Sequence, residues 1–221
     1  MAKRSRPLHQ YPADLVWAAA WAAYRINGGY HKNPMIEDGK IIKPTNRELV
    51  QMYLTDDSDQ PITKKDTEQG QNCRRVLANS VTMSMLKNEL TEWGELTARM
   101  TSLETVTTDY EISVITTMPK SYYQVILREN TDSRLAHCDG PLVGRINDRV
   151  DLEGEIVRCS YSNRFNTFYI TVITKANQQV FFAYREQLNT GRNIRFCGRV
   201  KRHADRATQL SRVKLVEQEA V

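Results

Sequence analysis

The hydrophobic pattern of the chain changes its period near Gly140, and this change limits the folds that the sequence can adopt. Before that point apolar residues recur every three or four positions, which is typical of amphipathic helices. After it apolar and polar residues alternate, which is typical of half-buried strands. We therefore expect an α+β protein with a mainly helical domain over residues 1–139 and a β domain over residues 140–221.

The helical half begins with the alanine-rich segment PADLVWAAAWAAYRINGG, which ends in two glycines. Trp17, Trp21 and Tyr24 recur at i, i+4 and i+7, so they form one aromatic stripe on a helix. Such a stripe either contacts nucleic acid or a partner, or packs into the core of its own domain. The spacing favours the core, because helices build cores with this repeat.

Further helices are expected along the first half. A capping box at Thr45 opens a short helix, and longer helical patterns follow over residues 64–90 and up to residue 103. Residues 109–134 combine β-branched clusters with helical spacing. Pro119 is expected to break this last stretch into two segments, because proline removes a helical hydrogen bond.

The second half contains five alternating segments with no long helix between them. The expected inward positions are Val150, Leu152 and Ile156; Phe168, Ile170 and Val172; Val180, Phe182 and Tyr184; Ile194, Phe196 and Val200; and Val213 and Leu215. An OB-like five-stranded β-barrel closes this number of strands economically, and an SH3-like barrel is the alternative. Gly154 and Gly198 lie within expected strands, where small barrels need bends or bulges.

Positive charge is concentrated in the β half. The whole chain has a net charge of +5, whereas residues 142–221 hold 14 Lys and Arg against 8 Asp and Glu. Residues 156–214 hold 12 bases against 2 acids. A local excess of this kind indicates a protein that binds nucleic acid or another anionic surface.

The sequence contains no short motif for a common catalytic site. A nucleophile elbow, a phosphate-binding loop, a metalloprotease motif and a deaminase motif are all missing, so we expect no catalytic residue, no metal and no cofactor. A nuclease with scattered metal-binding acids would leave no such motif, so a metal-dependent nuclease stays open.

Cysteine usage and hydropathy bear on location. The four cysteines form no CxxC pair, which disfavours a disulfide framework and a zinc site and favours a reducing cytoplasm. No apolar run approaches the roughly 18 residues that a membrane-spanning helix requires, so no membrane is expected among the partners.

Binding a single strand of nucleic acid requires cations that follow the phosphates and flat rings on which bases stack. The candidate residues in the β half supply both. They are Tyr161, Arg164, Phe165, Tyr169, Arg199, Lys201, Arg202, Arg206, Arg212 and Lys214. The turn from Lys201 to Arg206 has no nearby acid except Asp205, so it is the segment where a phosphate contact is most expected.

Folding alone offers an alternative role for part of this set. The outward bases of the fourth strand match three acids of the first strand in sign, and such pairs contribute about 0.2–1 kcal/mol each without any ligand. The pairs would join Arg195, Arg199 and Lys201 to Asp151, Glu153 and Glu155. Tyr161 and Phe165 could likewise close one end of the barrel.

Three motifs mark the β half, namely Gly144 with Asp148-Arg149, the segment GRVKRH at residues 198–203, and TQLSRVK at residues 208–214. Together they resemble an OB-fold module of phage-encoded proteins, over about a third of the chain. The resemblance implies a module that works around nucleic acid. It points to phage single-stranded-DNA-binding proteins that serve as RNA-polymerase cofactors.

The expected function is therefore non-enzymatic binding of single-stranded DNA in phage replication, recombination or transcription. An adaptor whose barrel binds a replication or transcription protein is the alternative beside the nuclease. The expected partners are single-stranded DNA, an RNA polymerase or replication protein, and a second copy of the chain. The helical half, which is close to neutral, would supply the protein contacts.

Overall fold

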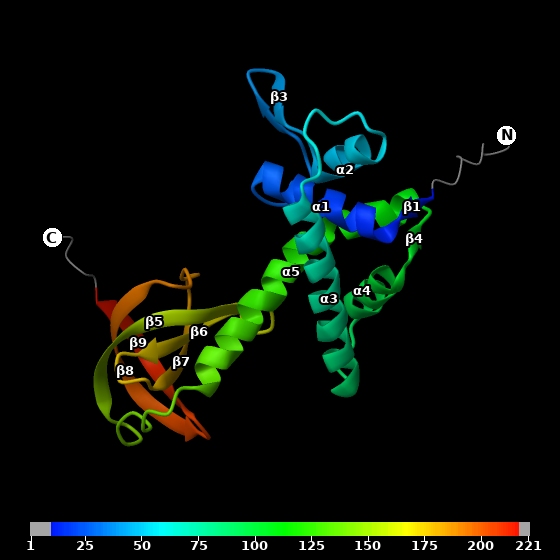
Figure 1. Ribbon diagram of the computed structural model, residues 1–221. Coiled ribbons are helices and arrows are strands. Elements are labelled where there is room, and N and C mark those ends of the chain that lie inside the picture. Colours follow the sequence, from blue (N-terminus) through cyan, green and yellow to red (C-terminus); the bar gives the residue numbers. More distant parts are fainter. Residues whose placement is uncertain (1–9, 217–221) are drawn as a thin grey trace. The chain divides into compact units, whose positions relative to one another are not determined.

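The computed structural model describes residues 10–216, and the chain divides into two compact units, Met1–Leu127 and Arg128–Val221 (Figure 1). Helices dominate the first unit, and a closed five-stranded barrel forms most of the second. The expected α+β class with an OB-like barrel is confirmed. The two units divide inside the last helix, before the hydrophobic period changes at Gly140.

The described part of the first unit contains helices and two short strand pairs. The helices are α1 (Ala13–Asn27), α2 (Asn46–Leu54), α3 (Lys64–Leu86), α4 (Glu92–Ser102) and α5 (Asp109–Ala136), which continues into the second unit. The antiparallel strand pairs are β1 (Tyr11–Pro12) with β4 (Thr105–Val106), and β2 (Met35–Glu37) with β3 (Lys40–Lys43).

Helix α1 is the centre of the helical core. Trp17 and Trp21 are buried, as the aromatic stripe predicted, and the alanines between them are buried as well. Helix α3 crosses α1 at Gly70, where a Cβ atom would lie 2.8 Å from the carbonyl carbon and oxygen of Trp17. Small residues on both helices therefore allow a close crossing that a larger side chain would prevent.

The helical unit also pairs its charges internally. Arg25 donates two hydrogen bonds, of 2.8 and 2.9 Å, to the carboxylate of Asp66, whose side chain is 1% exposed. Burial alone would raise the pKa of Asp66, but hydrogen bonds from Arg25 and Thr63 outweigh it and lower the pKa. Arg74 pairs with Asp14 at 2.8 Å in the same unit.

The expected break at Pro119 is wrong, because α5 runs through this residue as one helix. An interior proline costs about 3 kcal/mol. Ile112, Ile115 and Met118 are buried in the helical core on the same helix, and each buried side chain of this size contributes about 1.5–3 kcal/mol. Tertiary packing therefore offsets the local cost of the proline.

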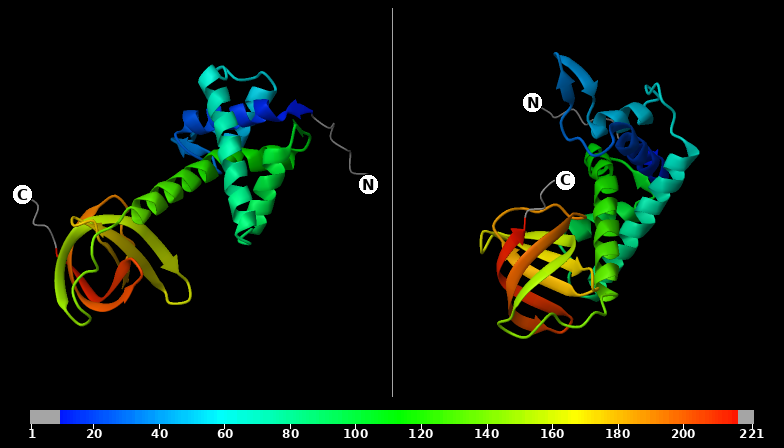
Figure 2. Two further views of the ribbon diagram at one scale, coloured as in Figure 1. Left: turned by 60° about the horizontal axis from the view of Figure 1, so that its bottom comes forward. Right: turned by 90° about the vertical axis from the view of Figure 1, so that its left-hand side faces the viewer.

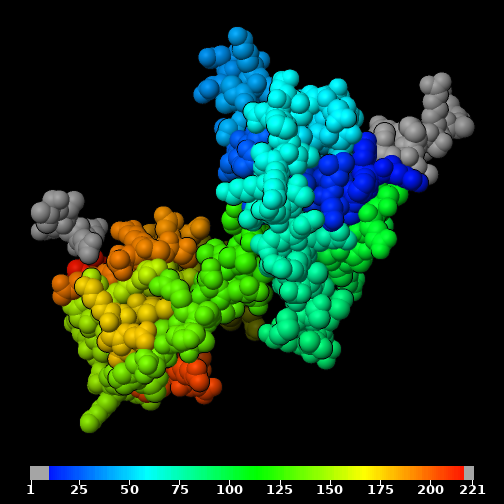
Figure 3. Space-filling view, in the orientation of Figure 1, coloured from blue at the N-terminus to red at the C-terminus, as the bar shows by residue number. Residues whose placement is uncertain are grey.

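The β2–β3 hairpin was not expected from the sequence. Its turn, Asp38-Gly39, has positive φ at both residues, which is the conformation that an Asp-Gly hairpin turn requires. The large apolar side chains on its strands are exposed, and they are Met35, Ile36, Ile41 and Ile42. Figure 3 shows the hairpin protruding from the rest of the first unit.

The barrel consists of β5 (Arg149–Ser162), β6 (Thr167–Thr174), β7 (Gln179–Tyr184), β8 (Asn193–Ala204) and β9 (Ala207–Val216). The strands close in the order β5-β6-β7-β9-β8, with β7 and β9 parallel and the other neighbours antiparallel (Figure 2). The inward positions expected from the alternating pattern all contribute to the barrel core: eight of the fourteen are buried, and the other six are partly buried and pack against them.

Register shifts bend the strands where the barrel closes. One lies in β5 between Ile156 and Arg158, and two lie in the β8–β9 pair. Gly198 lies at one of the β8–β9 shifts, as expected for a mid-strand glycine. Gly154 lies where β5 pairs with both neighbours, and a Cβ atom there would be 2.3 Å from the carbonyl oxygen of Ile173.

Candidate nucleic-acid interface

The acids on the outward face of β5 each have a cationic partner. Asp151 pairs with Arg195 at 3.0 Å, Glu153 with Lys175 at 2.7 Å, and Glu155 with Arg134 at 2.7 Å. The hydrogen bond from Arg195 lowers the pKa of Asp151, and the one from Arg134 lowers the pKa of Glu155.

Of the three cross-strand pairs considered from the sequence, one therefore forms. Arg199 and Lys201 make no ion pair with any residue of the described range 10–216. Two of the β5 acids pair instead with Lys175, which precedes β7, and with Arg134 of α5. The positive charge of β8 is therefore mostly left over after the acids of β5 are neutralised.

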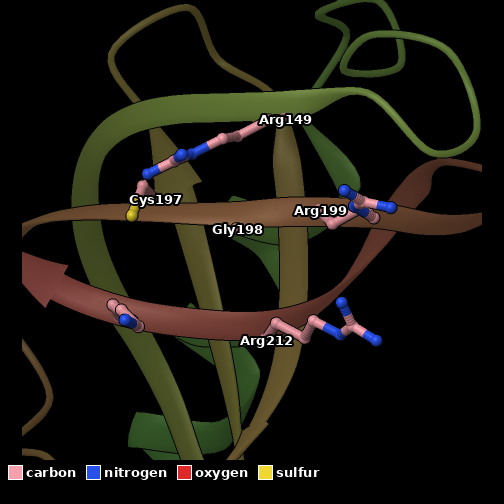
Figure 4. A pocket seen from close by; sticks show the side chains of 6 residues that line it. Arg149, Cys197, Gly198, Arg199 and Arg212 are labelled. Atoms are coloured by element: carbon pink, nitrogen blue, oxygen red, sulfur yellow. The ribbon is translucent and has the colours of Figure 1, made fainter.

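A groove on the outer surface of the barrel brings Arg199 of β8 together with cations of β5 and β9, and Lys201 is not among its lining residues. It has a volume of about 220 Å³, and the described residues that line it are Arg149, Cys197, Gly198, Arg199, Arg212 and Lys214. They come from β5, β8 and β9, and no acid is among them. Figure 4 shows the guanidinium group of Arg149 beside Cys197, and those of Arg199 and Arg212 extending to one side of the groove.

A β-bulge in β9 shapes this groove. Cys197 lies opposite Lys214 and Arg199 opposite Ser211, so two residues of β9, Arg212 and Val213, face Gly198 alone. Leu210 and Val213 both contact the barrel core, and their spacing of three residues breaks the strict alternation of a strand. The extra residue is Arg212, whose side chain is exposed at the groove.

The β5–β6 hairpin carries exposed rings. Tyr161 is 52% exposed and Phe165 is 59% exposed. The Arg164 guanidinium lies 5.3 Å from the centre of the Phe165 ring. Tyr161 packs against Phe168 at a centroid distance of 4.9 Å, so one face of this ring contributes to the barrel end while the rest stays accessible.

Tyr169 lies in the outward register of β6, opposite Ser160 and Ala183, and is half-buried. Beside it the end of α5 lies along β5, because Arg158 pairs with Asp132 and Glu155 with Arg134. This part of the barrel surface is therefore more covered than the hairpin tip.

A second groove joins the cations to the hairpin. It has a volume of about 410 Å³, and the described residues that line it are Thr167, Ala183, Tyr184, Arg185, Glu186, Arg212 and Val213. Arg212 lines both grooves, and Thr167 is the first residue of β6 after the ring-bearing turn. Arg212 therefore lies between the cationic groove and the start of β6, which follows the ring-bearing turn.

The β8–β9 turn, which the sequence marked as the foremost phosphate contact, is partly occupied by contacts within the protein. Arg202 donates to the side chain of Gln209 at 2.7 Å, and Arg206 donates to the Ala136 carbonyl at 3.4 Å. Arg206 also shares a groove with Asp139 and Asp205. The structure thus separates the turn residues from Arg199, Arg212 and Lys214, which share the cationic groove.

Arg149 was not among the site residues chosen from the sequence. It lies directly opposite Arg199 in the β5–β8 pair, and a pairing between distant strands cannot be read from either strand alone. A local signal for the bulge was present, because the spacing of Leu210 and Val213 fits a strand only if one residue is extra.

Among residues 10–216 there is no group of three or more His, Cys, Asp and Glu side chains that could hold a metal ion. The four cysteines are free, and burial raises the pKa of Cys73 to about 12. No helix in the described range has the length and apolar character needed to cross a membrane.

Comparison with protein-family models, curated proteins and solved structures gives no match.

Proposed function

We propose that this chain is a non-enzymatic protein that binds single-stranded DNA on the outer surface of its barrel. One observation carries the proposal: cations of β5, β8 and β9 share a groove whose described lining contains no acid. Cations placed in this way suit phosphates, since each neutralised phosphate releases a condensed counterion. In line with the phage resemblance, the proposed setting is phage replication, recombination or transcription.

The rings supply the second component that a single strand requires. Tyr161 and Phe165 are exposed at a hairpin that begins beside the groove shared by Arg212. Unstacked bases are free to stack on such rings, whereas bases within a duplex are not. This favours a single strand over a duplex as the ligand.

The test is a titration of the full chain against a fluorescently labelled oligothymidine at increasing salt. We expect affinity to fall with salt, by about 0.7 in the logarithmic slope for each neutralised phosphate. Phe165→Ala should weaken binding by about 1–3 kcal/mol while leaving the slope unchanged. Tyr110→Ala, which removes a similarly exposed ring from the helical unit, is the matched control and should have no effect.

Binding that ignores ionic strength, absence of binding, or a preference for duplex would overturn this proposal. Magnesium-dependent cleavage of the oligonucleotide would replace it with the nuclease alternative.

A second candidate is a protein-binding adaptor, which the β2–β3 hairpin favours. In the adaptor expected from the sequence the barrel binds the partner, whereas in this form the hairpin of the helical unit supplies the contact. The four exposed apolar side chains of this hairpin suit contact with a protein, and an RNA polymerase or a replication protein is the proposed partner. Ile36→Ser with Ile41→Ser should then abolish the partner contact without changing oligonucleotide affinity. A loss of oligonucleotide affinity in this variant would contradict the adaptor.

A further inference from the structure

The cationic groove combines two features that are ordinarily unfavourable in a β-sheet. The first is a cross-strand pair of like charge, since Arg149 lies directly opposite Arg199. On its other side Arg199 faces Ser211, so neither neighbouring strand places an acid opposite it. Like charges directly opposite each other destabilise a strand pair.

The second feature is the backbone of Arg212, which has a φ of 52°. Seven described residues other than glycine have positive φ, and the remaining six are Asp or Asn: Asp38, Asp56, Asn88, Asn147, Asn166 and Asn177. Asp and Asn tolerate this conformation because their short side chains bond to the local backbone, whereas arginine has no such compensation. Arg212 is the exception among residues 10–216.

Both features meet at the groove, and the bulge in β9 accounts for the second of them. With regular alternation from the buried Leu210, residue 212 would point into the barrel. The extra residue instead keeps Val213 and Leu215 in contact with the core and leaves Arg212 exposed between the two grooves. The strand thus gains one outward cation without losing an inward contact.

The chemistry of the groove selects its ligand. Three guanidinium groups and one ammonium group supply donors, and the one other side chain among the described lining residues is the thiol of Cys197. Such a site suits a ligand that carries negative charge and only acceptors. Phosphate fits better than carboxylate, because its oxygens accept from several guanidinium forks at once.

We infer that the groove over the β9 bulge is a defined binding site for one phosphate of the bound strand. From this phosphate the strand runs past Arg212 toward the β5–β6 hairpin. The inference rests on the proposed function and adds the place of the phosphate contact. The same chemistry would accept an internal phosphodiester or a terminal phosphate.

The test compares single charge removals in the full chain. Arg212→Gln and Arg199→Gln should each weaken oligothymidine binding about tenfold at low salt. Each should also flatten the logarithmic salt slope by about 0.7. Arg195→Gln is the control, because it removes an exposed cation of β8, the strand of Arg199, that is already paired with Asp151. It should change neither quantity appreciably.

Three probes then identify the phosphate. Oligothymidines with a 5′-hydroxyl, with a 5′-phosphate, and with uncharged methylphosphonate linkages are titrated against the wild-type chain and Arg212→Gln. If a terminal phosphate binds in the groove, the 5′-phosphate increases affinity for the wild type alone. If an internal phosphodiester binds there, the end group has no effect and the uncharged linkages remove the difference between wild type and Arg212→Gln.

The outcomes separate this inference from the proposed function. If Arg195→Gln weakens binding as much as Arg212→Gln, the charge acts diffusely, so the phosphate site is overturned while single-strand binding stands. If oligothymidine does not bind but inorganic pyrophosphate binds to the wild type and not to Arg212→Gln, the site stands and the proposed function fails. If neither probe binds, both fail. Unchanged far-ultraviolet circular dichroism confirms that each variant is folded.

Discussion

The two units of this protein differ in how much of their positive charge is left unpaired. In the helical unit, Arg25 is paired with the buried Asp66, and Arg74 with Asp14. In the barrel, Arg149, Arg199 and Arg212 surround a groove whose described lining holds no acid. The difference separates charge that serves folding from charge that is left available for a ligand. Removal of a paired charge should therefore lower stability in the first unit, whereas relief of the unpaired cations in the groove should leave the barrel equally or more stable.

The largest effect is expected where the helical unit is most closely packed. Gly70→Ala should destabilise this unit by about 3 kcal/mol, because the new methyl group would meet backbone atoms of α1 that cannot move aside. Urea unfolding followed by tryptophan fluorescence measures this, since all three tryptophans lie in the helical half.

The control for this change is Gly94→Ala in α4. Its new methyl group would meet the end of the Leu90 side chain, which can rotate, so the change should stay within about 1 kcal/mol. Equal losses in the two variants would mean that the α1–α3 crossing has no special role.

The next effect concerns the buried ion pair. Asp66→Asn should cost about 2–3 kcal/mol, because charged hydrogen bonds from Arg25 and Thr63 are lost in a buried position. The pKa of Asp66 is lower in the folded protein than its ordinary value of 3.8, so its contribution is present above that value. It is lost as the pH falls through the lower, folded-state pKa.

The acid-induced loss of stability in the helical unit should therefore be smaller in Asp66→Asn than in the wild type. Asp14→Asn removes the exposed carboxylate that pairs with Arg74 and should cost below about 1 kcal/mol. If both substitutions had the same cost, burial of the acid would not be what distinguishes them.

In the barrel, one substitution should raise the free energy of unfolding rather than lower it. Arg212→Gly should stabilise the barrel by about 1 kcal/mol, because relief of the left-handed backbone exceeds the entropy that glycine adds to the unfolded chain. Amide hydrogen exchange in β8 and β9 measures the change. Arg195→Gly in a regular part of β8 should instead destabilise by a similar amount. Loss of stability in Arg212→Gly would show that Arg212 serves the fold.

The smallest effect is expected from reversing one charge of the like-charged pair. Arg199→Glu places an acid opposite Arg149 and should stabilise the β5–β8 pairing by about 0.2–1 kcal/mol relative to Arg199→Gln. Hydrogen exchange in β5 and β8 reports the gain. A less stable glutamate variant would contradict the view that these two arginines repel each other.

The features that could be predicted from sequence depend on local pattern. The inward residues of β5, β6, β7 and β8 named above follow from alternation with period two, whereas in β9 the bulge breaks that alternation and the buried Leu210 was missed. The buried stripe of Trp17 and Trp21 follows from helical spacing. The continuous path of α5 through Pro119 was not predictable in this way, because it depends on burial against distant residues.

For the candidate site, the basic residues could be recognised from the sequence, but their spatial grouping could not. Arg199, Arg212 and Lys214 were recognised as basic residues, but their common groove depends on strand register. The partners of Glu153 and Glu155 are Lys175 and Arg134, which lie outside β5 and β8. Matching the opposite charges of β5 and β8 therefore predicted the wrong pairs for these two acids. The hydrogen bonds of Arg202 and Arg206 within the protein could not be predicted from the sequence either.

The bulge in β9 also has a meaning for insertion and deletion. Without Arg212 the strand would read Leu210, Ser211, Val213, Lys214, Leu215, which is an uninterrupted alternation of inward and outward residues. The barrel can therefore close in the same register with one residue fewer. The fold itself therefore does not require Arg212, and deletion of this single codon should leave the barrel intact.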